Sequence, residues 1–209
     1  NHPAYGTPEY NNIFVGMLKE IFKNYGPVWE LWWDGANGEG PNGKKQVYDF
    51  ARYERVVRKL SPNTVIFSDV GPDARWCGNE KGFIGTTNWN TLNTAGFTPG
   101  AGAPPADTLN TGNIYGKPWI PAECDVSIRP GWFYHKREDS LVKTPDQLFE
   151  IYLNSVGRGA NLLLNVPPDT DGLISSFDSA ALMRFRKLRD ESFRNNISKA
   201  GTGYFVSGR

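Results

Sequence analysis

The chain has 209 residues, and its 23 Lys and Arg nearly balance its 22 Asp and Glu. This even balance excludes the strongly basic surface that binding to nucleic acids or anionic membranes requires. The length is that of one large domain, enough to bury a core. No run of about 18 apolar residues is present, so the sequence predicts no insertion into a membrane.

The first predicted elements alternate between helix and strand. Apolar residues recur at three- and four-residue spacing over residues 11–24, which predicts an amphipathic helix. The apolar and aromatic run 28–33 predicts a buried strand with Asp34 at its carboxyl end. A second helix is predicted over residues 46–60 and a second strand over residues 64–67.

The second half continues the same alternation after a long irregular segment. Residues 70–116 are rich in Gly, Pro, Asn and Thr, and a loop of this length inside a domain is usually functional. Strands are predicted over residues 118–123 and 160–166. Helices are predicted over residues 147–156 and 179–193.

Short, continuously apolar strands between helices are typical of a parallel sheet that is covered on both faces. Polar residues collect where the predicted strands end, and in a (β/α) barrel that rim carries the active site. They are Asp34, Asp69, Glu123 and Asn165. We expect an α/β fold, the C-terminal part of a (β/α)8 barrel, with a small doubly wound sheet as the alternative. No glycine-rich phosphate loop follows a strand, which counts against a nucleotide-binding fold.

Histidine and cysteine are scarce, with two residues of each. His2 and His135 do not provide a histidine-built zinc site, and Cys77 and Cys124 lack a metal-ligand or CxxC spacing. The sequence therefore predicts neither a metal ion nor another cofactor. Whether the two cysteines pair depends on the fold and stays open.

Asp34 is the first candidate for chemistry. The alternation of side chains along a strand places Glu30, Trp32 and Asp34 on one side, with Asp34 at the mouth of the barrel. A carboxylate beside an aromatic residue and followed by Gly35 suits a nucleophile that approaches a sugar ring. An Asp at the end of a strand is equally often a turn or capping residue, so the position alone does not decide its role.

Longer motifs carry a family resemblance. The stretch ELWWDGANGEGP resembles the nucleophile motif of family 29 glycoside hydrolases, the α-L-fucosidases. Further segments resemble the family in the same order: HPAYGTPEYNN, RWCGNEKG, AECDVSIRPGWFYH and GANLLLNVPPDTDGLI. The resemblance covers about residues 2–195, and GNE and IRPGWFYH are similar to the subgroup that prefers α-1,3/1,4-linked fucose. We expect the catalytic domain to span residues 1–196, with a tail or linker over residues 197–209.

The resemblance implies a retaining double displacement, with one carboxylate as nucleophile and one carboxyl group as acid and then base. Asp34 matches the nucleophile. Glu80, in the GNE motif, matches the acid/base of the subgroup, and a loop can bring it beside the sugar ring. Glu123 is the alternative, because it follows an apolar run at a predicted strand end. Otherwise Glu123 holds a sugar hydroxyl, braces the site or pairs with a residue such as Arg129.

Four further residues are candidates for substrate binding. The resemblance places Trp32 against fucose and Trp132 against its C6 methyl group, where an apolar wall selects a 6-deoxy sugar. Arg75 is a candidate donor to a ring hydroxyl or to a carboxylate. His135 either contacts the leaving saccharide or is a surface residue.

The predicted function is an exo-acting α-L-fucosidase, secreted or periplasmic, with a fucosylated oligosaccharide or glycoconjugate as substrate. The alternatives are an inactive, lectin-like relative and a retaining hydrolase for another sugar. The family's first barrel half supplies a pair of adjacent histidines, and nothing here matches them. The chain also begins on Asn1-His2-Pro3, without an initiator Met or signal peptide. We therefore expect its structural partner to be a missing N-terminal half of the same barrel.

Overall fold

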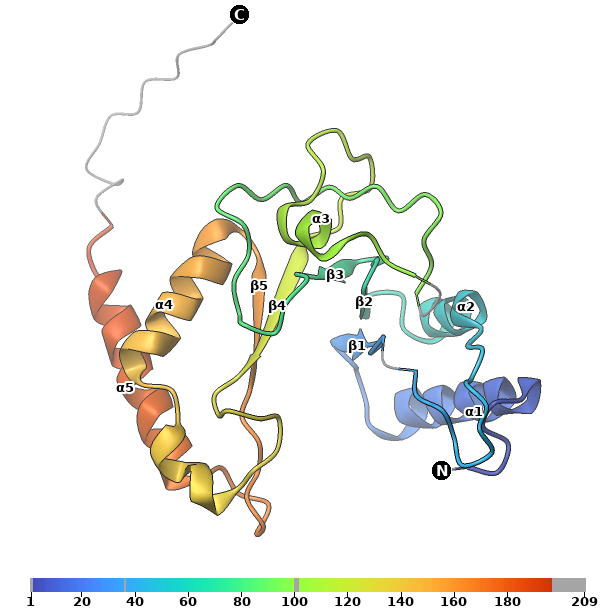
Figure 1. Ribbon diagram of the computed structural model, residues 1–209, viewed down its shortest axis with the longest axis horizontal. Helices are drawn as coiled ribbons and strands as arrows, with labels where there is room; N and C mark the ends of the chain where they lie inside the picture. Colours follow the sequence, from blue (N-terminus) through green and yellow to red (C-terminus); the bar gives the residue numbers. More distant parts are fainter. Residues whose placement is uncertain (1, 36, 100–101, 197–209) are drawn as a thin grey trace, which may run out of the picture. The chain divides into compact units, whose positions relative to one another are not determined.

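Five strands form one sheet in the order β1-β2-β3-β4-β5 (Figure 1). Their bounds are Glu30–Trp32 (β1), Val65–Ser68 (β2), Ala74–Trp76 (β3), Ala122–Ser127 (β4) and Asn161–Asn165 (β5). The first four strands pair in parallel, each with the next along the chain. A parallel sheet with helices in its connections confirms the predicted α/β class.

This computed structural model describes residues 2–35, 37–99 and 102–196. The chain divides into two compact units. Unit 1 comprises Asn1–Val126 and Asn154–Leu163, and unit 2 comprises Ser127–Leu153 and Leu164–Arg209. The predicted tail, residues 197–209, lies outside the described residues.

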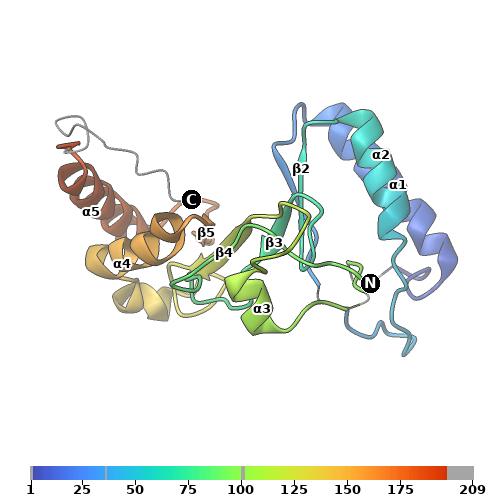
Figure 2. The ribbon, with the colours of Figure 1, turned by 90° about the horizontal axis from the view of Figure 1, so that it is seen from above.

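Two long helices pack against the β1–β2 end of the sheet in unit 1. Helix α1 spans Pro8–Asn24, with a proline in its first turn, where the missing N–H costs no hydrogen bond. Helix α2 spans Phe50–Leu60, and the side chain of Asp49 accepts a hydrogen bond from the backbone N–H of Arg52. The two helices lie side by side (Figure 2). A short third helix, α3, spans Ala106–Thr111.

The core of this part of unit 1 joins α1, α2 and β2. Its buried residues are Val15, Leu18, Trp33, Tyr53, Val57 and Ile66. Trp33 faces this core, whereas its neighbours Trp32 and Asp34 are exposed, as the alternation along a strand requires. The strand therefore separates a packing face from a face that is open to a ligand.

The structure departs from the prediction at β3, β4 and α2. Strand β3 lies inside the segment predicted to be irregular, because the charge of Arg75 interrupts its apolar pattern. Strand β4 begins four residues later than predicted, since Trp119 forms an isolated bridge with Thr91 instead. Glu123 is therefore the second residue of a strand rather than the last. Helix α2 begins at Phe50 and not at Gln46, whose side chain is buried.

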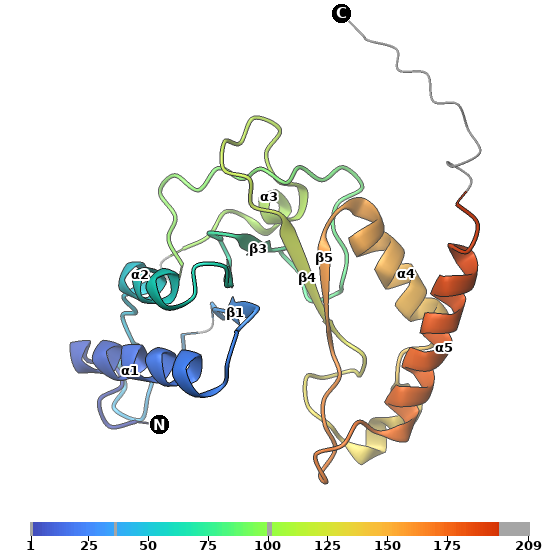
Figure 3. The same cartoon turned by 180° about the vertical axis from the view of Figure 1, so that it is seen from behind.

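The C-terminal helices are close to their predicted bounds. Helix α4 spans Pro145–Ser155, and helix α5 spans Ser176–Ser192. Two 3-10 helices, Lys136–Leu141 (η1) and Val156–Arg158 (η2), precede and follow α4. In unit 2, α4 and α5 lie side by side (Figure 3). The ring centroids of Tyr152 on α4 and Phe185 on α5 are 6.1 Å apart.

Both cysteines are buried free thiols. Cys77 follows β3, where its backbone N–H donates to the carbonyl oxygen of Glu123 on β4 over 3.1 Å. Among the described residues, no helix has the length and apolarity needed to cross a membrane.

A buried arginine organises unit 2. The Arg129 side chain is fully buried and pairs with Asp178 at 3.0 Å and with Asp139 at 2.9 Å. Its guanidinium also lies 4.6 Å from the ring centre of Tyr134. Asp178 is itself fully buried, at the start of α5, so Arg129 provides the positive charge that this carboxylate requires.

We predict that Arg129→Met lowers the free energy of unfolding by about 3–5 kcal/mol, because it leaves a buried carboxylate without a cation. Urea denaturation would measure this loss. Arg186→Met is the matched control, because Arg186 forms an exposed ion pair with Asp190 on α5. Equal stability of the two variants would contradict a structural role for Arg129.

Candidate active site

Six carboxylates of unit 1 lie on or just beyond its first four strands. Electrostatic contacts group them into three pairs. The pairs are Asp34 with Asp69, Glu30 with Glu123, and Glu80 with Asp125. In a parallel sheet, the carboxyl ends of neighbouring strands meet at one edge, so this concentration of charge identifies the candidate site.

The first pair lies where β1 and β2 end. Parallel pairing sets Trp32 opposite Phe67, and two residues later the strands lead into Asp34 and Asp69. Asp34 is exposed, and Asp69 is half-buried. Burial raises the pKa of Asp69, and the negative charge of Asp34 raises it further.

The second pair lies deeper. Glu123 is only 1% exposed, and both of its carboxylate oxygens are occupied. One accepts a hydrogen bond from the indole N–H of Trp32 at 3.0 Å, and the other from the side-chain amide of Asn161 at 2.5 Å. Glu123, on β4, therefore links β1 and β5 of unit 1 through these two hydrogen bonds.

Glu30 is the other member of this second pair. One of its carboxylate oxygens is buried and has no hydrogen-bond partner among the described residues. Burial raises the pKa of Glu30 to about 7, with further contributions from the charge of Glu123 and a hydrogen bond to it. Near neutral pH, Glu30 therefore still binds a proton in part of the molecules.

Trp32 lies between Glu30 and Asp34 in the sequence and on the same side of the strand. Its ring stacks on Phe67 with centroids 4.3 Å apart and planes inclined by 6°, while 36% of the residue stays exposed. The stack and the hydrogen bond to Glu123 hold the indole in one orientation. A flat, fixed and exposed aromatic face is what an apolar face of a sugar requires.

Glu80 belongs to the loop after β3 and is exposed. Asn79 stabilises that loop, because its side-chain oxygen accepts from the N–H of Lys81 at 3.0 Å and its amide donates to the Phe83 carbonyl at 3.0 Å. Burial raises the pKa of the neighbouring Asp125, and the charge of Glu80 contributes. A hydrogen bond from the Trp76 indole at 2.8 Å opposes that increase.

Arg75 does not face the site in this structure. Its side chain is fully buried on β3 and donates to the backbone carbonyls of Leu109 and Trp89, at 3.0 Å each, and to that of Ile120. A further hydrogen bond reaches the side chain of Asn88 at 3.0 Å. Burial lowers the pKa of the guanidinium to about 10. Arg75 therefore anchors the long segment between β3 and β4, which corrects its predicted contact with the sugar.

The ion pair considered for Glu123 is also corrected, because Arg129 pairs with Asp178 and Asp139 in unit 2. Trp132 and His135 belong to unit 2 as well, and both are exposed. The carbonyl of Trp132 accepts a hydrogen bond from Asn165 at 3.0 Å, which ties its backbone to the end of β5.

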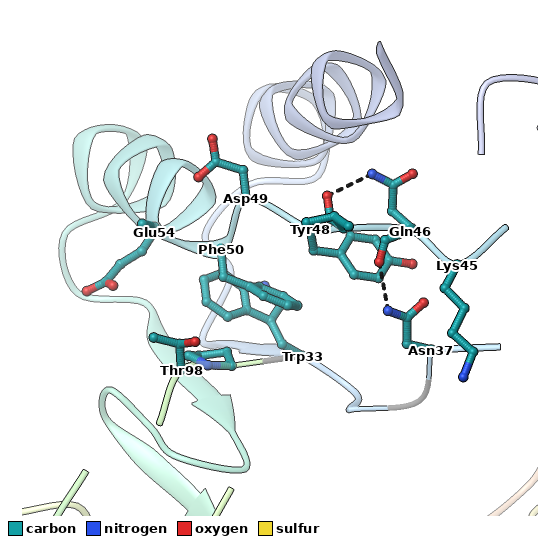
Figure 4. A pocket seen from close by; sticks show the side chains of 12 residues that line it. Trp33, Asn37, Lys45, Gln46, Tyr48, Asp49, Phe50, Glu54 and Thr98 are labelled. Atoms are coloured by element: carbon teal, nitrogen blue, oxygen red, sulfur yellow. Dashed lines mark hydrogen bonds between the residues drawn. The ribbon is translucent and has the colours of Figure 1, made fainter. Parts of the chain in front are cut away.

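A cavity of about 540 Å³ in unit 1 is lined in part by Trp33. Tyr48 and Phe50 contribute aromatic walls, and Asn37 is held at its edge by a 2.7 Å hydrogen bond to the Gln46 carbonyl (Figure 4). None of the six carboxylates lines it. The cavity therefore does not contain the strand-end carboxylates.

The arrangement supplies an exposed carboxylate at a strand end, Asp34, and a second exposed carboxyl group on a loop, Glu80. Exposed carboxyl groups of this kind are suited to nucleophilic and to acid–base chemistry. Within the described parts of the chain, no group of three or more His, Cys, Asp and Glu is arranged to hold a metal ion.

Three residues of the candidate site were not identified from the sequence: Glu30 as a group with a raised pKa, Asp125 and Asn161. The alternation along β1 already placed Glu30 on the Asp34 side, so a signal for it existed. Asp125 follows Glu123 by two residues, and it was overlooked because the predicted strand stopped too early. Asn161 carries no signal, because only the fold brings it to Glu123.

Comparison with known proteins is consistent along the chain. The family model described as "Alpha-L-fucosidase" matches residues 1–187. Alpha-L-fucosidase 1 of Arabidopsis thaliana is 43% identical over 197 residues, which cover 94% of this chain and 38% of that protein.

Solved structures agree with this match. A glycoside hydrolase 29 family member from an unknown rumen bacterium is 37% identical, with a TM-score of 0.87 over 99% of this chain and 38% of its own. A Ruminococcus gnavus GH29 fucosidase, solved in complex with fucose, is 27% identical, with a TM-score of 0.79 over 95% of this chain and 44% of its own. The chain therefore spans less than half the length of these relatives, and its sheet matches the fold of this family.

We predict that stability falls as pH rises from about 4.5 to about 7, because folded Glu30 retains a proton that the unfolded chain has lost. Glu30→Gln stays neutral and should make the melting temperature less dependent on pH across this window. Glu20→Gln, an exposed change on α1, is the control and should keep the wild-type slope. A wild-type slope in Glu30→Gln would show that another group titrates.

Proposed function

Since this chain belongs to the α-L-fucosidase family, glycoside hydrolase family 29, we propose that the protein that contains it removes terminal α-L-fucose from glycans. The observation that carries the proposal is the exposed Asp34 at the end of β1, beside the fixed indole of Trp32. This is a carboxylate presented next to a flat apolar surface, as attack on a bound sugar requires.

The reaction that we propose is a retaining double displacement. A carboxylate oxygen of Asp34 attacks the anomeric carbon of fucose, while Glu80 gives its proton to the departing glycosidic oxygen. The covalent fucosyl ester is then attacked by water, which loses a proton to Glu80 as the bond to Asp34 breaks. Two inversions at one carbon leave fucose in its original configuration.

Burial supports Glu80 over Glu123 as the acid/base. Glu80 is exposed on a loop, so its carboxyl group is accessible to a leaving group. Glu123 is almost completely buried, and Trp32 and Asn161 occupy both of its oxygens. A group held in this way is suited to orienting Trp32 rather than to exchanging protons with substrate.

The proposal also covers the residues that recognise the substrate and the linkage that is preferred. We assign Trp132 to the C6 methyl group of fucose and His135 to the leaving saccharide, with α-1,3/1,4 linkages preferred. The exposure of both side chains supports their availability to a ligand. We also propose that chain outside these residues completes the barrel, since the match covers 38% of the Arabidopsis relative. A secreted or periplasmic location is part of this proposal.

We expect Asp34→Ala to lower turnover of an aryl α-L-fucoside by at least about a thousandfold, because covalent catalysis is lost. The measurement requires the full-length protein that contains this chain. Circular dichroism would confirm that the variant is folded. A folded variant with near-normal turnover would exclude Asp34 as the nucleophile, and a wild-type protein that binds but does not hydrolyse fucosides would indicate a lectin-like relative.

Glu80→Ala should abolish hydrolysis of natural linkages but spare the first step on an aryl fucoside, whose good leaving group needs no proton. The fucosyl ester then accumulates, and azide should accelerate its breakdown to a fucosyl azide of retained configuration. Glu123→Ala is the matched variant, and it should lower both activities together without azide rescue. Azide rescue of Glu123→Ala alone would exchange the two roles.

A further inference from the structure

The proposed double displacement assigns no role to Asp69, although Asp69 lies beside Asp34. The pairing of β1 with β2 continues at the end of the strands, where the Trp33 N–H donates to the Phe67 carbonyl at 3.0 Å. Asp34 and Asp69 follow directly, one on each chain. Asp69 is therefore beside the proposed nucleophile because of backbone pairing and not because of a mobile loop.

Gly35 permits this close approach. A Cβ atom at Gly35 would lie 2.5 Å from one carboxylate oxygen of Asp69, closer than real Cβ atoms come to other heavy atoms. The backbone of Gly35 is not left-handed, so its conformation does not require glycine. The absent side chain instead leaves room for the Asp69 carboxylate next to Asp34.

The hydrogen bonds of the described residues leave the Asp69 carboxylate available as an acceptor. No N–H or O–H group in residues 2–35, 37–99 and 102–196 donates a hydrogen bond to it. The side chain is half-buried, and the nearby charge of Asp34 is of the same sign. A half-buried carboxylate beside a charge of the same sign is unfavourable, and a hydroxyl donor from a ligand would stabilise it.

We propose that Asp69 binds the substrate, accepting a hydrogen bond from the 2-hydroxyl of the fucose that Asp34 attacks. This inference rests on the proposed function. The anomeric carbon has two ring neighbours: the ring oxygen, which has no proton to donate, and C2, which carries a hydroxyl. A carboxylate directly beside the nucleophile therefore finds its nearest donor at the 2-hydroxyl.

Such a contact contributes to rate as well as to binding. Hydrogen bonds to the 2-hydroxyl of a glycoside strengthen in the oxocarbenium-like transition state. A hydrogen bond to a charged acceptor contributes about 1.5–3 kcal/mol, which corresponds to about a 10- to 100-fold change in rate or affinity. Asp69 would thus select sugars with a free hydroxyl at C2.

The test is a double-mutant cycle between Asp69 and single hydroxyl groups of the substrate. The full-length protein, as wild type and as Asp69→Ala, is assayed on 4-nitrophenyl α-L-fucoside and on its 2-, 3- and 4-deoxy analogues. The ratio of kcat/KM for the parent fucoside to that for the 2-deoxy analogue should fall about 10- to 100-fold in Asp69→Ala. The ratios for the 3- and 4-deoxy analogues should not change.

Gly35→Ala is a second variant that keeps the carboxylate but displaces it, and it should lower the 2-deoxy ratio in the same direction. Gly16→Ala on α1 is its matched control, because a Cβ there meets no atom within 4 Å. Both variants keep the Asp69 side chain, so they remain informative if Asp69→Ala fails to fold.

The outcomes separate this inference from the proposed function. Unchanged ratios in active Asp69→Ala, or in Gly35→Ala if Asp69→Ala does not fold, would overturn the contact. A loss confined to the 3- or 4-deoxy analogue would overturn its assignment to the 2-hydroxyl. A wild-type protein inactive on the parent fucoside would overturn the proposed function and this inference together.

Discussion

The parallel pairing of β1 with β2 determines the geometry of the candidate site. Because Trp32 lies opposite Phe67, their rings stack, and the ends of both strands bring Asp34 beside Asp69. The same alternation sends Trp33 into the core with α1 and α2. A shift by one residue would exchange the two faces, burying the carboxylate and exposing the core tryptophan. The packing of the helices thus maintains the register on which the site depends.

That register brings negative charges close together, and hydrogen bonds from surrounding residues stabilise them. Indole N–H groups of Trp32 and Trp76 donate to Glu123 and Asp125, so two buried carboxylates are solvated by aromatic donors. Burial, and after it the charge of Glu123, raises the pKa of Glu30 to about 7, so that ionisation of Glu30 is unfavourable below neutral pH. In the proposed reaction, the remaining negative field favours the positive charge that develops on the sugar ring.

Burial distinguishes the two glutamates that motif and position leave as rivals. Both lie near strand ends in the sequence, yet Glu123 is held inside the sheet layer while Glu80 is exposed on a loop. The role of Arg75 is decided in the same way, because its donors are used by backbone carbonyls of the segment that precedes β4. Residues that carry a family motif can therefore support the site from within rather than contact the ligand.

The order of residues alone was enough to predict the α/β class, the family, and Asp34 at the end of the first strand. These depend on apolar runs and motifs that are formed by residues close together in the sequence. Strand β3, the true start of β4 and the contacts of Glu123 were beyond such reasoning, since charged residues interrupt the apolar pattern of both strands. Asp69 beside Asp34, and Asn161 on Glu123, arise only when distant segments pair, because hydrogen bonding and burial between them depend on three-dimensional packing.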